Sequence, residues 1–142
     1  MTDRQVIIGV AKSDAHAVAN HLIAMRLRLD GYTVINLGVC TPLEEFAEAL
    51  AQYPDAEAIV IGSLNGHAYE DLSELPQLRA SGRIHCPVIL GGNLSVGSHK
   101  EADERTRLLA LGVDHILDDA DQIPLLLDLL QASRTGTTTT AA

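Results

Sequence analysis

Five short apolar runs, rich in β-branched residues, recur roughly 25–30 residues apart along the chain. They cover residues 6–10, 33–37, 58–61, 87–90 and 115–117. The first, third and fourth runs are almost wholly apolar, which is typical of parallel strands that are covered by helices on both faces. The intervals between them are long enough for one helix each. The spacing therefore predicts five strand–helix units.

Helical patterns fill these intervals, and the predicted helices cover residues 16–30, 42–52, 70–81, 101–111 and 121–132. The first carries four large apolar side chains at helical spacing, Val18, Leu22, Met25 and Leu29. The second begins with a predicted N-cap at Thr41 and Pro42 in the first position. Pro76 interrupts the third, so we expect the chain to restart a helix there.

Alternation of strands and helices predicts an α/β fold with a doubly wound, five-stranded parallel sheet. For a chain of 142 residues, the flavodoxin-like strand order 2-1-3-4-5 is the natural expectation. A hydrophobic content of 46% suffices for one core. We expect one domain over residues 1–133 and a disordered tail over the Thr-, Gly- and Ala-rich residues 134–142.

Charge and cysteine content limit the partners and the compartment. The net charge of −9 disfavours binding to nucleic acids or anionic membranes and is compatible with a partner that carries a basic patch. Cys40 and Cys86 form no CxxC motif and are expected to be buried free thiols. Met1 begins no signal peptide, and no apolar run reaches membrane-spanning length. We therefore expect a cytoplasmic protein.

Unusual loops follow the carboxyl ends of the first, third and fourth predicted strands. They read Lys-Ser-Asp-Ala-His at 12–16, Gly-Ser-Leu-Asn-Gly-His at 62–67 and Gly-Gly-Asn-Leu-Ser-Val-Gly at 91–97. Strand order reverses between the first and third strands, and ligands bind at such a point in this architecture. Adjacent glycines let a wide, flat ligand approach the main chain, although an ordinary turn has the same composition. The sequence predicts a ligand site at this edge.

Asp14 and His16, both in the first loop, are of the residue types that form a metal-binding pair. A histidine binds a metal through one ring nitrogen, and a carboxylate on the other nitrogen fixes the tautomer and raises the basicity of the ligand. The same two residues are also compatible with a helix start, in which Asp14 caps the helix and His16 lies in its first turn. Spacing alone leaves both interpretations open.

The chain lacks the residues that three other functions of this fold require. A phosphate-accepting receiver needs an Asp at the end of the third strand, where this chain has Gly62 and Ser63. A flavin phosphate loop is disfavoured because Asp14 would repel phosphate, and the chain has few aromatic residues to enclose a flavin. A dinucleotide-binding fold needs G-x-G-x-x-G after the first strand, where Gly9 stands alone.

Over about residues 5–130 the chain resembles the cobalamin-binding small (sigma) subunits of methylaspartate mutase, also called glutamate mutase. The family signature is D-x-H-x-x-G, then S-x-L, then G-G. Here it reads Asp14-Ala15-His16-Ala17-Val18-Ala19, Gly62-Ser63-Leu64 and Gly91-Gly92. The resemblance implies a base-off adenosylcobalamin, whose nucleotide tail lies between the first helix and the sheet. His16 would be the lower axial cobalt ligand, and Asp14 would hydrogen-bond it.

The resemblance further implies a complete set of contacts and a partner. The cofactor-binding residues would be Asp14, Ala15, His16, Ala17, Ala19, Gly62, Ser63, Leu64, Gly66, Gly91, Gly92 and Asn93, with His16 on the metal. A larger TIM-barrel subunit would bind the substrate in a heterotetramer that interconverts glutamate and 3-methylaspartate by a radical mechanism. This chain would be inactive alone and would hold no catalytic residue beyond the cobalt ligand. The alternatives are a free-standing cobalamin carrier or sensor, and a family member that no longer binds cobalamin.

Two residues depart from the family signature, and both lie where the tail is expected. Ala19 replaces the glycine that gives the tail room beside the first helix. Gly62 replaces the serine whose hydroxyl bonds the displaced benzimidazole, and Ser63 is expected to point to the other side of the strand. A lost hydrogen bond to a buried nitrogen costs about 1–3 kcal/mol. We therefore expect cobalt ligation to be retained more securely than tail affinity.

Overall fold

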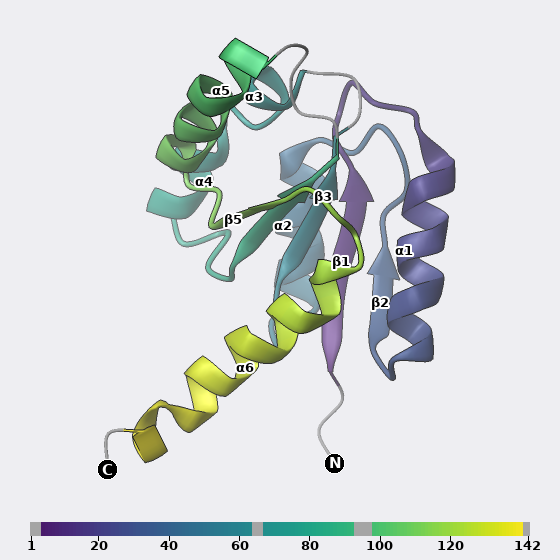
Figure 1. The fold of residues 1–142 in the computed structure, drawn as a ribbon, viewed down its shortest axis with the longest axis vertical. Helices are drawn as coiled ribbons and strands as arrows, with labels where there is room; N and C mark the ends of the chain where they lie inside the picture. Colours follow the sequence, from purple (N-terminus) through teal and green to yellow (C-terminus); the bar gives the residue numbers. More distant parts are fainter. Residues whose placement is uncertain (1–3, 64–66, 93–97, 141–142) are drawn as a thin grey trace.

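The computed structural model describes residues 4–63, 67–92 and 98–140. Strands and helices alternate along the chain (Figure 1). The elements are β1 (Gln5–Val10), α1 (Ala17–Leu29), β2 (Thr33–Asn36), α2 (Leu43–Gln52), β3 (Ile59–Gly62), α3 (Ala68–Asp71), α4 (Leu75–Ala80), β4 (Val88–Gly91), α5 (Ser98–Leu111), β5 (His115–Leu117) and α6 (Gln122–Thr140). The helix predicted over 70–81 is divided into α3 and α4, and Pro76 lies in the first turn of α4 as expected.

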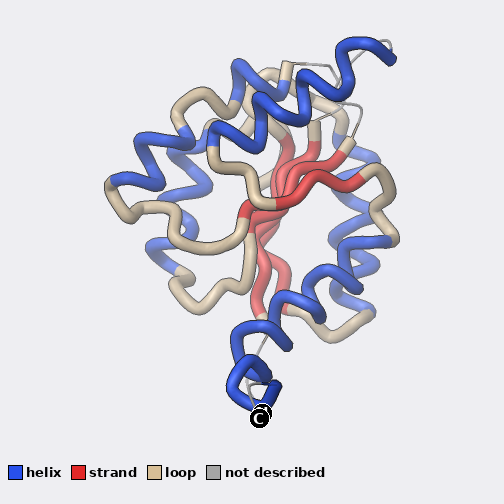
Figure 2. The backbone as a smooth tube through the Cα atoms, turned by 60° about the vertical axis from the view of Figure 1, so that its left-hand side comes forward, coloured by secondary structure: helices blue, strands red, loops and turns tan. Residues whose placement is uncertain are grey.

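The five strands form one parallel sheet in the order β2-β1-β3-β4-β5, which confirms the predicted fold class. The sheet lies between two layers of helices (Figure 2). Residues at the carboxyl edge are in register across the three central strands, with Val10 opposite Gly62 and Gly62 opposite Gly91. This edge is where the sequence predicts the ligand.

Successive residues of each strand contribute to different cores. Ile7 and Ile61 pack with Phe46 in the core that lies under α2, α3, α4 and α5. Ile8 and Val60 pack in the second core, under α1 and α6. Gly9 leaves space for Phe46, because a Cβ atom at Gly9 would lie 2.7 Å from the Phe46 ring. The second core is smaller, and the candidate site lies on its side of the sheet.

Helix α1 turns its large apolar side chains toward solvent. Val18, Leu22, Met25 and Leu29, the four residues with helical spacing, are 73%, 60%, 56% and 83% exposed. The buried face instead carries Asn20, Ala24 and Leu27. Of these three side chains only that of Ala24 is shorter than the exposed ones. The spacing therefore identified the helix but not the face that packs.

Two local expectations from the sequence are wrong. Thr41 does not cap α2, because its hydroxyl donates to the carbonyl of Gly38 at 3.1 Å and Pro42 occupies the cap position. Cys40 is exposed rather than buried, and it has a left-handed φ of 53° in the loop before α2. Cys86 is buried, as expected. Both errors fall in the turn after β2, where the chain reverses direction through Gly38 and Cys40.

At the amino-terminal edge of the sheet, opposite the carboxyl edge, Arg4 contacts Glu57, Asp128 and Tyr32. Its guanidinium donates two hydrogen bonds to the buried Glu57 carboxylate, at 2.7 and 2.9 Å, and one to Asp128 of α6 at 2.7 Å. The same group lies 4.7 Å from the ring centroid of Tyr32. Burial raises the pKa of Tyr32 to about 12.

The last helix, α6, continues to Thr140, beyond the boundary at residue 133 where the sequence places the start of a tail. The extent of the domain stays a prediction. Within residues 4–63, 67–92 and 98–140, no helix combines the length and the apolar character needed to cross a bilayer.

Candidate cofactor site

The loop between β1 and α1 is built around the carboxylate of Asp14. The main-chain N–H of Asp14 donates to Ala11 at 2.9 Å, and its carbonyl accepts from the N–H of Cys40 at 2.9 Å. The Asp14 side chain is fully buried. One of its oxygens accepts two hydrogen bonds from His16, one from the backbone N–H at 3.0 Å and one from ring atom Nδ1. Asp14 therefore fixes both the main chain and the ring of His16.

The contact that spacing alone left open between Asp14 and His16 is present. Helix α1 begins at Ala17, with His16 in the cap position and without a side-chain cap. The bond of Asp14 to Nδ1 selects the tautomer in which Nε2 keeps its lone pair. The His16 side chain is 58% exposed, while its partner carboxylate has no exposure. This arrangement can present Nε2 to a metal.

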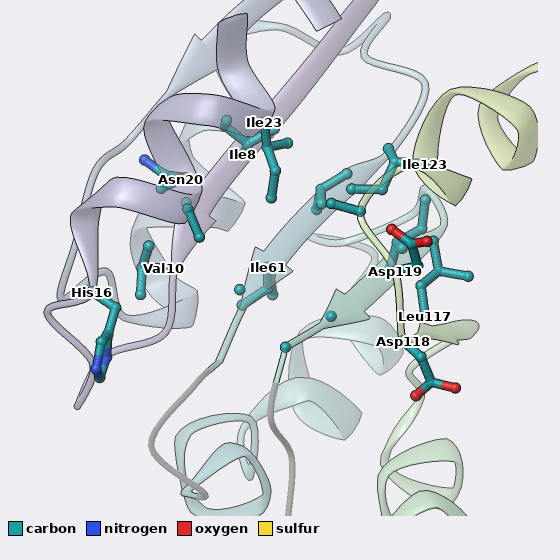
Figure 3. Close-up of a pocket in the computed structure, with 18 residues that line it drawn as sticks. Ile8, Val10, His16, Asn20, Ile23, Ile61, Leu117, Asp118, Asp119 and Ile123 are labelled. Atoms are coloured by element: carbon teal, nitrogen blue, oxygen red, sulfur yellow. The ribbon is translucent and has the colours of Figure 1, made fainter. Parts of the chain in front are cut away.

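A cavity of about 220 Å³ lies beside His16, between α1, the sheet and the start of α6 (Figure 3). Its walls are mostly aliphatic, and they include Ile8, Ile23, Val60, Ile89 and Ile123. The cavity opens where α1 carries Ala19 and Asn20 toward the sheet. On α1, only Ala19 among the residues that line the cavity has a short side chain.

Glycines make the part of the cavity at the carboxyl edge flat. Gly62 and Gly91 are paired in register and both line the cavity. A Cβ atom added at Gly62 would have the carbonyl oxygen of Gly9 at 3.9 Å as its nearest contact, and one at Gly91 would lie 3.5 Å from the carbonyl oxygen of Leu117. Gly62 therefore has room for a side chain. Gly92 differs, because its φ of 118° requires glycine.

Polar residues that the sequence analysis did not single out line the cavity at two places. Asn20 donates to the side-chain oxygen of Asn36 at 2.8 Å, and that oxygen also accepts from the N–H of Gly38 at 3.0 Å. Asp118 and Asp119 follow β5. The sequence carries a signal for these residues. Asn20 follows His16 by one helical turn, and Asp118 and Asp119 follow a predicted strand at the carboxyl edge.

Five predicted residues line the cavity, namely His16, Ala19, Gly62, Gly91 and Gly92. Ala15 and Ala17 are exposed on either side of His16. Ser63 does not line the cavity; its N–H donates to the carbonyl of Gly91 at 2.8 Å, and its fully buried hydroxyl has no hydrogen-bond partner within the described structure. Leu64, Gly66 and Asn93 lie outside the described residues.

Sequence comparisons match the chain to a known family over most of its length. The B12 binding domain model covers residues 4–121. The chain is 35% identical over 144 residues to the glutamate mutase sigma subunit of Halobacterium salinarum, covering 98% of this chain and 96% of that protein. It is also 35% identical over 138 residues to the glutamate mutase sigma subunit 1 of Haloarcula marismortui, covering 97% and 91%.

Solved structures share the fold. A cobalamin-binding protein from Desulfitobacterium hafniense aligns with a TM-score of 0.67 at 18% identity, over 94% of this chain and 58% of that chain. The methanol:cobalamin methyltransferase complex of Methanosarcina barkeri aligns with a TM-score of 0.69 at 26% identity, over 93% of this chain and 48% of that chain. A histidine kinase receiver domain from Arabidopsis thaliana aligns with a TM-score of 0.62 at 15% identity, over 91% of this chain and 90% of that chain. From the family match and the sigma subunit relatives together, this chain belongs to the B12-binding domain family, in the group of the glutamate mutase sigma subunits.

Proposed function

We propose that this chain is the cobalamin-binding subunit of an adenosylcobalamin-dependent carbon-skeleton mutase that interconverts glutamate and 3-methylaspartate. The observation that carries the proposal is the His16 imidazole, whose Nδ1 bonds the buried Asp14 carboxylate while the ring lies at the mouth of an apolar cavity. The identity of the sigma subunit relatives supports the choice of reaction.

The donor set fits cobalt in a corrin ring better than a bare metal ion. Nowhere in the described ranges do three His, Cys, Asp or Glu side chains converge on one point. A free transition metal ion needs several protein ligands. A corrin supplies most of the cobalt ligands itself, so one imidazole from the protein would suffice to hold the metal. His16 is suited to that role because Asp14 fixes its tautomer.

The cavity fits one part of such a cofactor rather than the whole. Sites that enclose a complete small molecule hold about 300–1,000 Å³, and this cavity holds about 220 Å³. Its aliphatic walls suit a heterocyclic base, which would lie between α1 and the sheet. The flat edge at Gly62 and Gly91 leaves the main chain open to a wide ring.

In this proposal the residues of the chain bind and orient the cofactor and take no other part in the reaction. His16 would ligate the cobalt, Asp14 would hold the imidazole, and Ala19, Gly62 and Gly91 would enclose the tail. When bound, adenosylcobalamin supplies a cobalt–carbon bond that breaks homolytically. In this proposal the tail would fill the cavity, and the amino acid substrate would bind on another chain. That chain would be a larger TIM-barrel subunit, joined to this one in a cytoplasmic heterotetramer.

The test is electron paramagnetic resonance of cob(II)inamide, which lacks the benzimidazole nitrogen of cob(II)alamin, with the full-length protein. We expect the cobalt signal to carry the superhyperfine triplet of one nitrogen. His16→Ala should abolish the triplet, whereas His21→Ala, on the exposed side of α1, should retain it. A triplet that survives His16→Ala would refute the ligand assignment, and absence of binding at millimolar cofactor would indicate a family member that no longer binds cobalamin. Turnover of glutamate after addition of the larger subunit would then separate the mutase from a free-standing carrier.

A further inference from the structure

The loop that carries Asp14 and His16 is attached to a helix in the opposite layer of the fold. Ser13 donates two hydrogen bonds to the same oxygen of Asp71, one from its hydroxyl at 2.6 Å and one from its backbone N–H at 3.2 Å. Asp71 is the last residue of α3, which contributes Ala68 to the core beneath α2, α4 and α5. The bond therefore crosses the carboxyl edge of the sheet.

The bond acts on the residue that precedes Asp14 in the chain. Main-chain bonds to Ala11 and Cys40 already fix the backbone of Asp14. The Asp71 carboxylate fixes Ser13 through two donors at once, so rotation of this residue would break both bonds. The loop is thus held from β1, from the turn after β2 and from α3. The first two attachments are backbone bonds, whereas the third depends on one side chain that can be changed by mutation.

We propose that Asp71 is a positioning residue for the axial histidine, acting through Ser13 and Asp14. This inference rests on the proposed function and extends it to a residue that does not line the cavity. A loop that is ordered before binding loses less conformational freedom when the ligand arrives. Without the Asp71 carboxylate, the loop would populate conformations in which the imidazole is displaced from the cavity mouth.

The experiment compares Asp71→Ala with Asp71→Asn, which keeps one carbonyl oxygen as acceptor for Ser13. Hydroxocobalamin affinity and the cob(II)inamide nitrogen triplet are measured for each. Asp71→Ala should weaken binding about tenfold and reduce the fraction of triplet signal, and Asp71→Asn should recover most of both. Ser13→Ala removes the hydroxyl donor but keeps the backbone N–H, so it should weaken binding by no more than Asp71→Ala, and the double variant should be no weaker than Asp71→Ala. Glu74→Ala removes an exposed carboxylate nearby and should behave as wild type.

Hydrogen exchange of the ligand-free protein keeps this inference separate from the proposed function. Amides of residues 14–16 should exchange faster in Asp71→Ala, while those of the central strands remain protected. Unchanged affinity and exchange in Asp71→Ala would overturn the positioning role, as would an Asp71→Asn variant that is as weak as Asp71→Ala. Faster exchange in Asp71→Ala, combined with a wild-type protein that binds no cobalamin, would refute the proposed function and leave the attachment of the loop established.

Discussion

Replacing Gly62 with serine would add a hydroxyl to the cavity without displacing any atom. The nearest neighbour of the new Cβ would be the carbonyl oxygen of Gly9 at 3.9 Å, which is an ordinary contact distance. The position lies at the end of β3 and has no positive φ, so the backbone accepts a side chain. A hydrogen bond to a polar atom of the bound tail contributes about 0.5–1.5 kcal/mol. The dissociation constant should therefore fall by about 2- to 12-fold.

The assay is a titration of each variant with hydroxocobalamin, followed by visible absorption. Gly62→Ala is the matched control, because it fills the same space without a hydroxyl. We expect Gly62→Ser to bind more tightly than both the wild type and Gly62→Ala. A serine variant that binds no more tightly than the alanine variant would refute the reasoning, since the hydroxyl would then have no partner in the complex.

Further predictions concern stability and the opposite wall of the cavity. Arg4→Ala leaves the buried Glu57 carboxylate without its main partner and should lower the free energy of unfolding by about 3 kcal/mol, measured in urea. Arg26→Ala, which removes an exposed ion pair, should cost less than about 1 kcal/mol. Because the pKa of Tyr32 is raised from 10.0 to about 12, stability should be constant below pH 10 with respect to this group and fall as the pH rises toward 12. Tyr32→Phe should remove that decline, and a decline of equal size in the variant would contradict the assignment. Ala19→Gly should widen the cavity and tighten hydroxocobalamin binding, at a cost of about 0.5–1 kcal/mol in helix stability; weaker binding by a variant that remains folded would show that Ala19 does not restrict the tail.

The sheet could be predicted because its three central strands, β1, β3 and β4, are almost wholly buried and therefore carry their own signal. The intervals between the five apolar runs suit one helix each, so strand order follows from general rules of α/β topology. Helix α1 shows the limit of this approach. Its spacing fits a helix whose apolar stripe is buried, but the tertiary structure buries Asn20, Ala24 and Leu27 instead. Periodicity alone does not identify the packed face when both faces are apolar.

The candidate site was predictable at its centre and not at its margins. Asp14 and His16 follow the first strand at the topological switch point, and their spacing allows the observed contact. Asn20, Asp118 and Asp119 were missed because each depends on how α1 and α6 approach the sheet. The turn after β2 was misread for a similar reason. There, Thr41 bonds back to Gly38 instead of capping α2, a choice that depends on the local path of the chain.

The apolar stripe on α1 also affects how separate molecules of this protein behave in solution. Four large exposed side chains on one helix attract other apolar surfaces, while the net charge of −9 makes the molecules repel one another. Salt weakens the repulsion, since the screening length falls from about 30 Å at 0.01 M to about 8 Å at 0.15 M. Acidification toward the sequence pI of 4.9 has the same effect by removing charge. Colloidal stability should therefore decrease with rising ionic strength and with falling pH, and Leu22→Glu should extend the range in which the protein stays dispersed.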